Sequence, residues 1–228
     1  AMGGIPTDVN GRVLSDEKNT VLPGVYAAGE AACVSVHGAN RLGTNSLLDI
    51  VVFGKRAGES MLEYVSKTKS TSISDSAADD LVNKINNLIE KEHTDEFSVG
   101  RIRNDLQESM EENAKIFRSE ETLSKQTDIL ENLRERYENV TIFDKGKVFN
   151  TELMEAIELD YLLDMSESTV ASALARKESR GAHSRQDFPD RDDGNFMKHS
   201  FAFKNGNSAN LRYKDVELGK YEPMERKY

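Results

Sequence analysis

Hydrophobic residues recur at helical spacing through the middle of the chain. Between residues 77 and 180 they form four successive sets, which predict a bundle of four helices with charged residues on its solvated faces. Helical spacing continues over residues 170–175. The four sets are Leu81, Ile85, Leu88 and Ile89; Val99, Ile102, Leu106, Met110, Ala114 and Phe117; Leu123, Ile129, Leu130, Leu133 and Tyr137; and Leu153, Ala156, Ile157, Leu159, Leu162 and Leu163.

The first 70 residues follow another pattern. Nine of the 15 glycines lie between residues 2 and 65, which indicates many turns and close backbone contacts. Short apolar runs at residues 12–14 and 24–28 predict strands, and Pro23-Gly24 predicts a turn between them. From Ser46 to Val65 the apolar positions return to helical spacing, with Ser46 as the expected N-cap.

Changes in composition divide the chain. Residues 66–76 are rich in Ser and Thr and predict a linker. Further on, a charged loop at residues 184–194 precedes two apolar runs, 199–203 and 210–213, which predict a strand pair joined by a turn at residues 205–207. We therefore expect an α/β chain in three parts: a glycine-rich domain at residues 1–70, a helical bundle at residues 77–180 and a small α/β region at residues 181–228.

Charge and composition exclude several classes of protein. Lys and Arg total 30 against 40 Asp and Glu, and the resulting formal charge of -10 argues against a general binder of nucleic acid or of anionic membranes. The chain has no apolar run of about 18 residues that predicts a membrane-spanning helix. The first residues lack a signal-peptide pattern and read as the middle of a fold, so we expect a truncated or excised polypeptide.

Cysteine and histidine usage narrows the chemistry further. The single cysteine, Cys33, excludes an intramolecular disulfide and fits a reducing compartment, and we expect it to be a buried small residue. The four histidines lie far apart and show no Cys/His spacing, so the sequence predicts no metal site. They are His37, His93, His183 and His199.

One segment combines features of a ligand site. A strand ends in Ala28-Gly29-Glu30, and a glycine-rich loop then runs into the helix that starts near Ser46. Glycines allow a flat or charged ligand to approach the backbone, and a helix start offers N–H groups and a partial positive charge. Arg41 can hold a carboxylate by two parallel hydrogen bonds. The segment therefore fits either an anionic ligand or reducible ring, or an ordinary strand–helix connection.

The same segment and a later one resemble a known family. Both look like the C-terminal half of the flavoprotein subunit of succinate dehydrogenase and fumarate reductase, and the blocks occur in the family's order over nearly the whole chain. The blocks are Met2-Gly3-Gly4-Ile5, Gly29-Glu30, His37-Gly38-Ala39-Asn40-Arg41-Leu42-Gly43, Asn45-Ser46-Leu47-Leu48, Arg180-Gly181-Ala182-His183-Ser184-Arg185, Asp187-Phe188-Pro189 and Arg191-Asp192-Asp193.

The resemblance implies roles for five residues. Glu30 would bond to the ribityl chain of FAD, and Ser46 and Leu47 would contact the isoalloxazine ring, whose reduced form a helix N-terminus stabilises. Arg41 would bind a carboxylate of the dicarboxylate substrate, and Thr44 would line the same pocket. Substrate held there would give up a hydride to the flavin, with positioning as the main contribution of the protein.

Two histidines have open or indirect roles in this interpretation. His37 is either a donor close to the flavin or a packing residue of the loop. His183 is expected in a hydrogen-bond network that fastens the C-terminal region to the flavin domain, in preference to direct catalysis. The chain has no G-x-G-x-x-G fingerprint for the adenine dinucleotide, so we expect residues 1–70 to be the remnant of an FAD-binding domain and the isolated chain to be inactive.

The resemblance also implies partners and a location. In this family electrons pass from the flavin through an iron–sulfur subunit to quinone at membrane anchor subunits. The chain would then be peripheral, on the cytoplasmic face of a bacterial inner membrane or the matrix face of a mitochondrial one. Three alternatives stay open. The enzyme could run as a fumarate reductase; L-aspartate oxidase is a related fold that fits the C-terminal blocks less well; and the isolated chain could be a noncatalytic interaction or assembly module, with residues 77–180 docking a partner.

Overall fold

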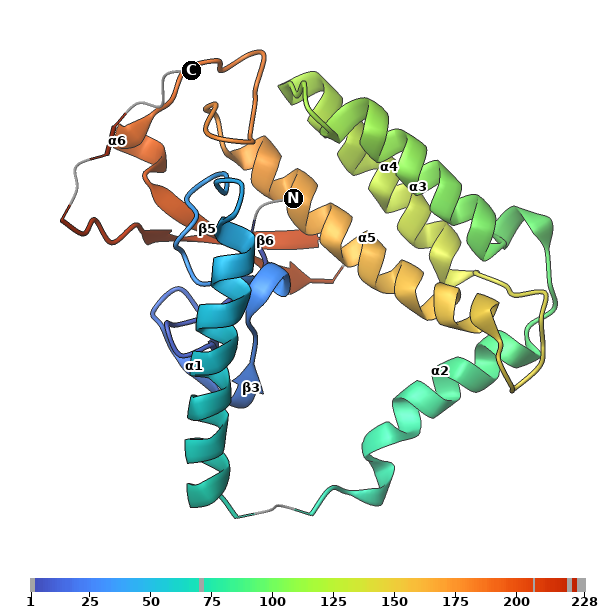
Figure 1. Cartoon of the computed structure of the whole chain (residues 1–228). Helices are drawn as coiled ribbons and strands as arrows, with labels where there is room; N and C mark the ends of the chain where they lie inside the picture. Colours follow the sequence, from blue (N-terminus) through green and yellow to red (C-terminus); the bar gives the residue numbers. More distant parts are fainter. Residues whose placement is uncertain (1–2, 70–71, 207, 221–222, 225–228) are drawn as a thin grey trace.

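The computed structural model describes residues 3–69, 72–206, 208–220 and 223–224 (Figure 1). Its mixture of helices and small sheets confirms the expected α/β class. Parts of three predictions lie outside the described residues: Met2 at the first strand, Ser70 and Thr71 in the linker, and Asn207 in the last turn. The division into domains at residues 1–70, 77–180 and 181–228 stays a prediction.

The N-terminal part contains two small sheets. β1 (Ile5–Pro6) pairs in parallel with β4 (Ala32–Cys33), and β2 (Arg12–Leu14) pairs antiparallel with β3 (Val21–Tyr26). A short 3-10 helix, η1 (Gly29–Ala31), precedes β4. The prediction of a strand at residues 12–14 is therefore confirmed.

The predicted turn at Pro23-Gly24 is wrong, because both residues lie inside β3. The chain reverses earlier, where the carboxylate of Asp16 accepts hydrogen bonds from the backbone N–H groups of Lys18 and Thr20. A proline is tolerated in β3 because the strand has only one neighbour in its sheet. Cys33 is also only half-buried, at the edge of the small sheet with β1, and not the buried residue that we expected.

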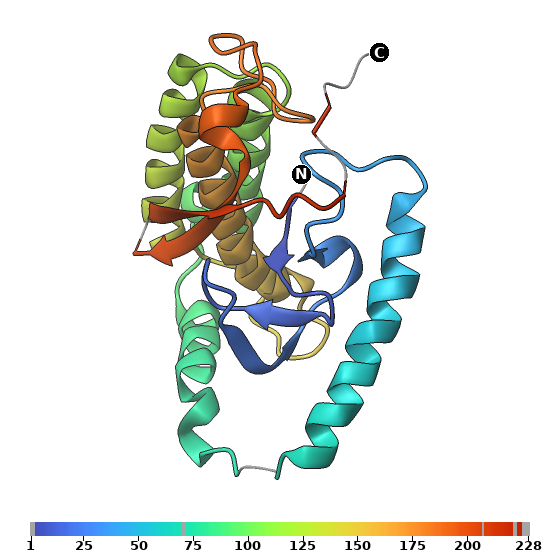
Figure 2. The same ribbon diagram turned by 90° about the vertical axis from the view of Figure 1, so that its left-hand side faces the viewer.

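Helix α1 (Asn45–Lys67) confirms the helix predicted from residue 46. Its N-cap position is Thr44, not Ser46. It packs against β3 and η1, and Gly11 of the first hairpin approaches so closely that a Cβ there would lie 2.6 Å from Cβ of Ala57. Figure 2 shows α1 standing apart from the other long helices, with the small strands between them. Much of its apolar surface is consequently exposed, and five of its large apolar side chains are more than 60% exposed: Leu47, Leu48, Val51, Leu62 and Val65.

The four predicted helices of the bundle are present. They are α2 (Asp79–Glu90), α3 (Val99–Ala114), α4 (Glu120–Glu138) and α5 (Thr151–Ala175), with η2 (Asp75–Ala78) and η3 (Asp95–Phe97) before α2 and α3. The main hydrophobic core lies among them and contains most of the predicted positions. Its buried members include Leu88, Val99, Ile102, Leu106, Leu123, Leu130, Leu133, Ala156, Leu159, Leu163 and Val170.

Capping side chains explain where the bundle helices begin. At α4, Ser119 and Thr122 form a reciprocal capping box, and at α5 the side chain of Asn150 accepts from the N–H of Leu153. The apolar positions at residues 153–163 and 170–175 belong to this one helix of 25 residues. Phe117, expected on the second helix, lies beyond the end of α3 and is exposed.

The C-terminal segment packs on α5 and contacts the N-terminal part of the chain. After α6 (Asp193–Phe196), β5 (Lys198–Asn205) and β6 (Ser208–Asp215) form the predicted antiparallel hairpin, which packs on α5. The hairpin also reaches the N-terminal part: Arg212 contacts Glu17 at 3.3 Å, and Nζ of Lys214 donates to Asn19 over 2.6 Å. The C-terminal hairpin therefore contacts the segment between β2 and β3.

Candidate functional site

The candidate site lies on the connection from β4 to α1. Gly29, at the start of η1, lies close against α1 and has a φ of 74°. A Cβ at this position would lie 3.0 Å from Cγ1 of Ile50, so glycine allows both the left-handed conformation and the close approach. Glu30 is thereby placed beside the first turns of α1.

The side chains of Arg41 and Glu30 face each other across this connection. Nη2 of Arg41 lies 3.9 Å from Oε1 of Glu30, and the two side chains are 40% and 85% exposed. An exposed ion pair at this distance contributes little to stability. Both groups are therefore accessible to a ligand, one as a carboxylate-binding cation and the other as a hydrogen-bond acceptor.

The other three predicted site residues lie at the start of α1. Thr44 occupies the N-cap and is exposed, Ser46 is half-buried, and Leu47 is exposed. Because Thr44 and Leu47 are exposed, this opening turn is accessible to a ligand. The helix start and the Arg41 loop thus lie together on the exposed surface, and the roles of these residues stay predictions.

The backbone of this turn is less free than expected. The N–H groups of Asn45 and Leu47 already donate to the carbonyls of Leu42 and Thr44. The side chain of Thr44 makes no capping hydrogen bond, however, so the partial positive charge of the helix start is not offset by its own N-cap side chain. The turn keeps its attraction for negative charge while it offers fewer free donors.

His37 anchors the loop to α1. Its Nε2 lies 2.6 Å from Oδ2 of Asp49, and the carboxylate is buried. Nδ1 of His37 is buried and has no hydrogen-bond partner among the described residues. Of the two roles left open for His37, this geometry supports packing within the loop.

His183 lies in a hydrogen-bond network, but not in the predicted one. Nδ1 is 2.9 Å from Nη1 of Arg118, and Nε2 is 3.0 Å from the carbonyl of Arg176, so both partners belong to the helical and C-terminal parts. The link to the glycine-rich part is made by its neighbours instead: the N–H of Ala182 donates to the carbonyl of Ala39 over 3.2 Å.

A buried carboxylate holds this C-terminal turn in place. Glu178 accepts hydrogen bonds from Arg176, Arg180 and the N–H of Asp192, at 2.7 to 2.9 Å. Burial alone would raise the pKa of Glu178, but these hydrogen bonds outweigh it and hold the pKa below its ordinary value. The charged form is therefore the stable one. Arg185, also buried, pairs with both oxygens of Asp187.

Three residues of this surface were missed by sequence reasoning. They are Ala39, which contacts the C-terminal turn; Gly181, the residue of that turn that lies against Ala39; and Asp49, the partner of His37. Asp49 carries a signal that was available, because it lies three positions after Ser46 on the helix, where a carboxylate can face the preceding loop. The contact between Ala39 and Gly181 has no local signal, since 142 positions separate them.

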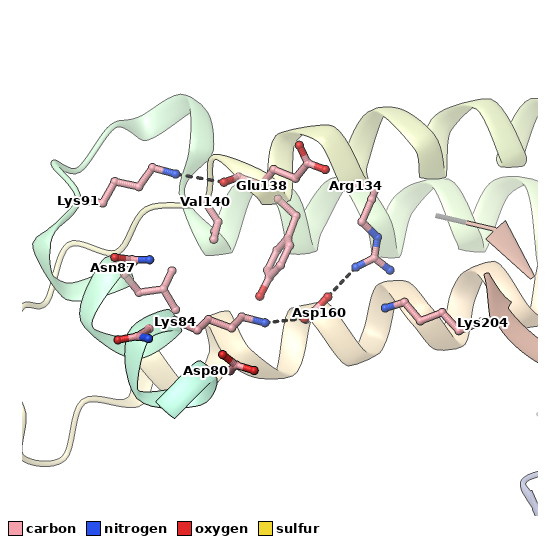
Figure 3. A pocket seen from close by; sticks show the side chains of 12 residues that line it. Asp80, Lys84, Asn87, Lys91, Arg134, Glu138, Val140, Asp160 and Lys204 are labelled. Carbon is pink, nitrogen blue, oxygen red and sulfur yellow. Dashed lines mark hydrogen bonds and ion pairs between the residues drawn. The ribbon is translucent and has the colours of Figure 1, made fainter. Parts of the chain in front are cut away.

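A separate hollow of the described surface lies elsewhere. It has a volume of about 540 Å³ and lies among α2, α4 and α5, and it shares no residue with the Arg41 loop (Figure 3). Three of its four cations form ion pairs: Lys84 and Arg134 contact Asp160, each at 2.6 Å, and Lys204 contacts Asp164, whereas Lys91 donates to the carbonyl of Glu138. Internal ion pairs therefore occupy Lys84, Arg134 and Lys204, which are not free to bind an anionic ligand.

Metal sites and membrane-spanning helices are both absent from the part of the chain that the structure describes. Among the described residues, no group of three or more His, Cys, Asp or Glu side chains is arranged to hold a metal ion. Within the same ranges, none of the helices combines the length and the hydropathy that crossing a membrane requires.

Two family models match this chain. A family model described as "Fumarate reductase flavoprotein C-term" matches residues 103–228, and one described as "FAD binding domain" matches residues 1–47. The second match covers Glu30, Arg41 and the start of α1. FAD is the cofactor that these matches indicate.

Individual relatives match almost the whole chain. The succinate dehydrogenase flavoprotein subunit of Rickettsia felis is 41% identical over 95% of this chain, and the fumarate reductase flavoprotein subunit of Haemophilus influenzae is 39% identical over all of it. The structure of quinol fumarate reductase FrdA of E. coli superimposes with a TM-score of 0.87 at 37% identity over 97% of the chain. This chain spans 37% of the length of each of these proteins. It belongs to the succinate dehydrogenase and fumarate reductase flavoprotein family.

Proposed function

We propose that this chain forms the C-terminal part of an FAD-dependent oxidoreductase that oxidises succinate to fumarate. The observation that carries the proposal is the pairing of Arg41 with Glu30 on the open side of the first turn of α1. It brings a cation suited to a carboxylate beside an acceptor suited to a hydroxyl, at a helix start that favours negative charge.

Each residue has a defined part in this proposal. Arg41 binds one carboxylate of the dicarboxylate through two parallel hydrogen bonds, and Thr44 lines the same pocket. Glu30 accepts a hydrogen bond from the ribityl chain, and Ser46 and Leu47 contact the isoalloxazine ring. Bound FAD supplies the electron-accepting chemistry. The contribution of these side chains is to hold substrate and ring in fixed relative positions.

Partners and location follow from the same proposal. Electrons leave through an iron–sulfur subunit toward quinone at membrane anchor subunits, and the protein is peripheral on the cytoplasmic face of a bacterial inner membrane or the matrix face of a mitochondrial one. The formal charge of -10 agrees with attachment through protein subunits, since anionic lipid would repel it. The bare apolar side of α1 fits burial against more of the flavoprotein, so the isolated 228-residue chain is expected to be inactive.

Fumarate reduction is the second candidate. It is favoured by the fumarate reductase relatives, which match this chain about as well as the succinate dehydrogenases do. The same Arg41 and helix start serve either direction, because both substrates are dicarboxylates.

One experiment separates these readings. The complete flavoprotein is assayed for succinate-dependent reduction of a dye and for fumarate-dependent oxidation of a reduced viologen. We expect bound flavin absorbance and faster succinate oxidation. Faster fumarate reduction would establish the second candidate. A colourless protein with neither activity would contradict the oxidoreductase proposal and support the noncatalytic assembly module.

A further inference from the structure

We propose that Gly181 and Ala182 are positioning residues for Arg41: the C-terminal turn holds the substrate loop at Ala39, and substrate affinity depends on this contact. The inference rests on the proposed function, because it assigns Arg41 to the dicarboxylate. Beyond that function, the inference makes the geometry of the Arg41 site depend on a C-terminal segment that lies 140 residues further along the chain.

The contact is close enough to exclude any side chain at residue 181. A Cβ on Gly181 would lie 2.6 Å from both the carbonyl carbon and the oxygen of Ala39, and 2.8 Å from its Cβ. These distances are far inside van der Waals contact, and two of the three atoms are backbone, which cannot rotate away. Beside it, the N–H of Ala182 donates to the same carbonyl over 3.2 Å.

The turn that makes this contact is held firmly on the bundle side. The backbones of Arg180 and His183 bond to each other at 2.8 and 3.0 Å. The side chain of Arg180 is held by buried Glu178, and the ring of His183 is held by Arg118. An added side chain at residue 181 would therefore displace the loop more readily than the turn.

The loop has few other supports. Among the described residues, its hydrogen bonds to neighbouring elements include those of Ser35 to His199 and of His37 to Asp49, before Ala39, and that of Asn45 to Leu42, after Arg41. Ala39 thus lies between two tethers, two positions before Arg41. A shift of its backbone is passed to Arg41, and binding of a carboxylate by two parallel hydrogen bonds is sensitive to such shifts.

Three glycine variants of the complete, FAD-loaded flavoprotein test the proposal. Gly181→Ala adds a Cβ and strains the backbone, whose φ is 59°. Gly181→Asn adds a Cβ but tolerates this left-handed conformation better. Gly206→Ala is the matched control, because Gly206 has a φ of 60° and no atom within 4 Å of a Cβ. The dissociation constant for malonate, a dicarboxylate probe, is measured from the flavin difference spectrum.

We expect both Gly181 variants to raise the dissociation constant for malonate and the KM for succinate by about tenfold or more. The control should stay within about twofold of the unaltered protein. Because only FAD-loaded protein is titrated, a lower yield of folded variant does not obscure the result. Gly181→Asn with unaltered malonate binding would overturn the proposal, and so would an equal loss in Gly206→Ala.

A double-mutant cycle separates positioning from general damage. If Gly181 acts through Arg41, the effect of Gly181→Ala on malonate binding should shrink markedly in an Arg41→Lys background. An undiminished effect there would contradict action through Arg41. An unaltered flavoprotein that binds no malonate would contradict the proposed function itself, and the positioning role would fall with it.

Discussion

Arg118 donates a hydrogen bond from Nη1 to Nδ1 of His183 over 2.9 Å. Because arginine can only donate, Nδ1 must be unprotonated, and Nε2–H is then free to donate to the carbonyl of Arg176. Burial, together with the charges of Arg118, Arg176 and Arg185, lowers the pKa of His183 below 6.5. The folded protein therefore holds this ring neutral.

Stability should consequently fall in mild acid. The pKa of His183 is lower in the folded than in the unfolded state, so its contribution is complete above about pH 6.5 and is lost as the pH falls toward the folded pKa. Thermal unfolding midpoints between pH 5 and pH 8 measure this slope, and His183→Gln should reduce it. His199, whose pKa burial and Lys214 also lower, provides the comparison: His199→Gln should leave the part due to His183 in place. An unchanged slope in His183→Gln would contradict the prediction.

Arg41→Ala should abolish dicarboxylate oxidation and leave FAD bound. The guanidinium is assigned to the substrate, and its 3.9 Å contact with Glu30 is too weak to matter for folding. Flavin absorbance per protein and succinate turnover check the two halves of the prediction. Lys55→Ala, at an exposed position on α1, is the control and should behave as the unaltered protein. Retained turnover in Arg41→Ala would remove Arg41 from the substrate site.

Glu30→Ala should weaken FAD retention. Glu30 is assigned to the ribityl chain, and loss of a charged acceptor for a hydroxyl typically costs about 1.5–3 kcal/mol, which corresponds to about a tenfold to a hundredfold loss of affinity. The flavin content after dialysis measures this change. Glu59→Ala, also exposed and on α1, should keep its flavin. Equal flavin contents in both variants would argue against the assigned role.

Leu159→Ala should destabilise the bundle by about 2–5 kcal/mol, because its fully buried side chain would leave a cavity in the main core. Leu162 lies three residues further along α5 but is 39% exposed, so Leu162→Ala should cost only about 1 kcal/mol or less. Urea unfolding followed by circular dichroism compares the two variants. Similar losses would show that the core is not centred where the structure has it.

The helical bundle could be predicted from the sequence because its signals are local. Leu106, Leu130 and Leu159 recur at helical spacing with polar neighbours, and each is buried as this pattern indicates. At Pro23-Gly24, by contrast, the local pattern predicted a turn where the structure has a strand. A proline–glycine pair usually marks a turn, but β3 has only one neighbour in its sheet and accommodates both residues.

The candidate site was predictable only in part, for a related reason. Glu30, Arg41 and Ser46 lie within one connection, so a local pattern and a family resemblance both point to them. The residues that hold these three in position, however, come from segments distant in the sequence, and only packing brings them together. The sequence of residues 180–183 indicated a link to the glycine-rich part, but it suggested His183, whereas the structure makes that link through Ala182 and Gly181.

The meeting of Ala39 with Gly181 has a consequence for biosynthesis. A ribosome that adds about 5–20 residues per second needs on the order of ten seconds to pass from one position to the other. During that interval the nascent loop exists without its distant support. Contact between the Arg41 loop and the C-terminal turn therefore forms late in the synthesis of each molecule, and a stalled or shortened translation product would lack it.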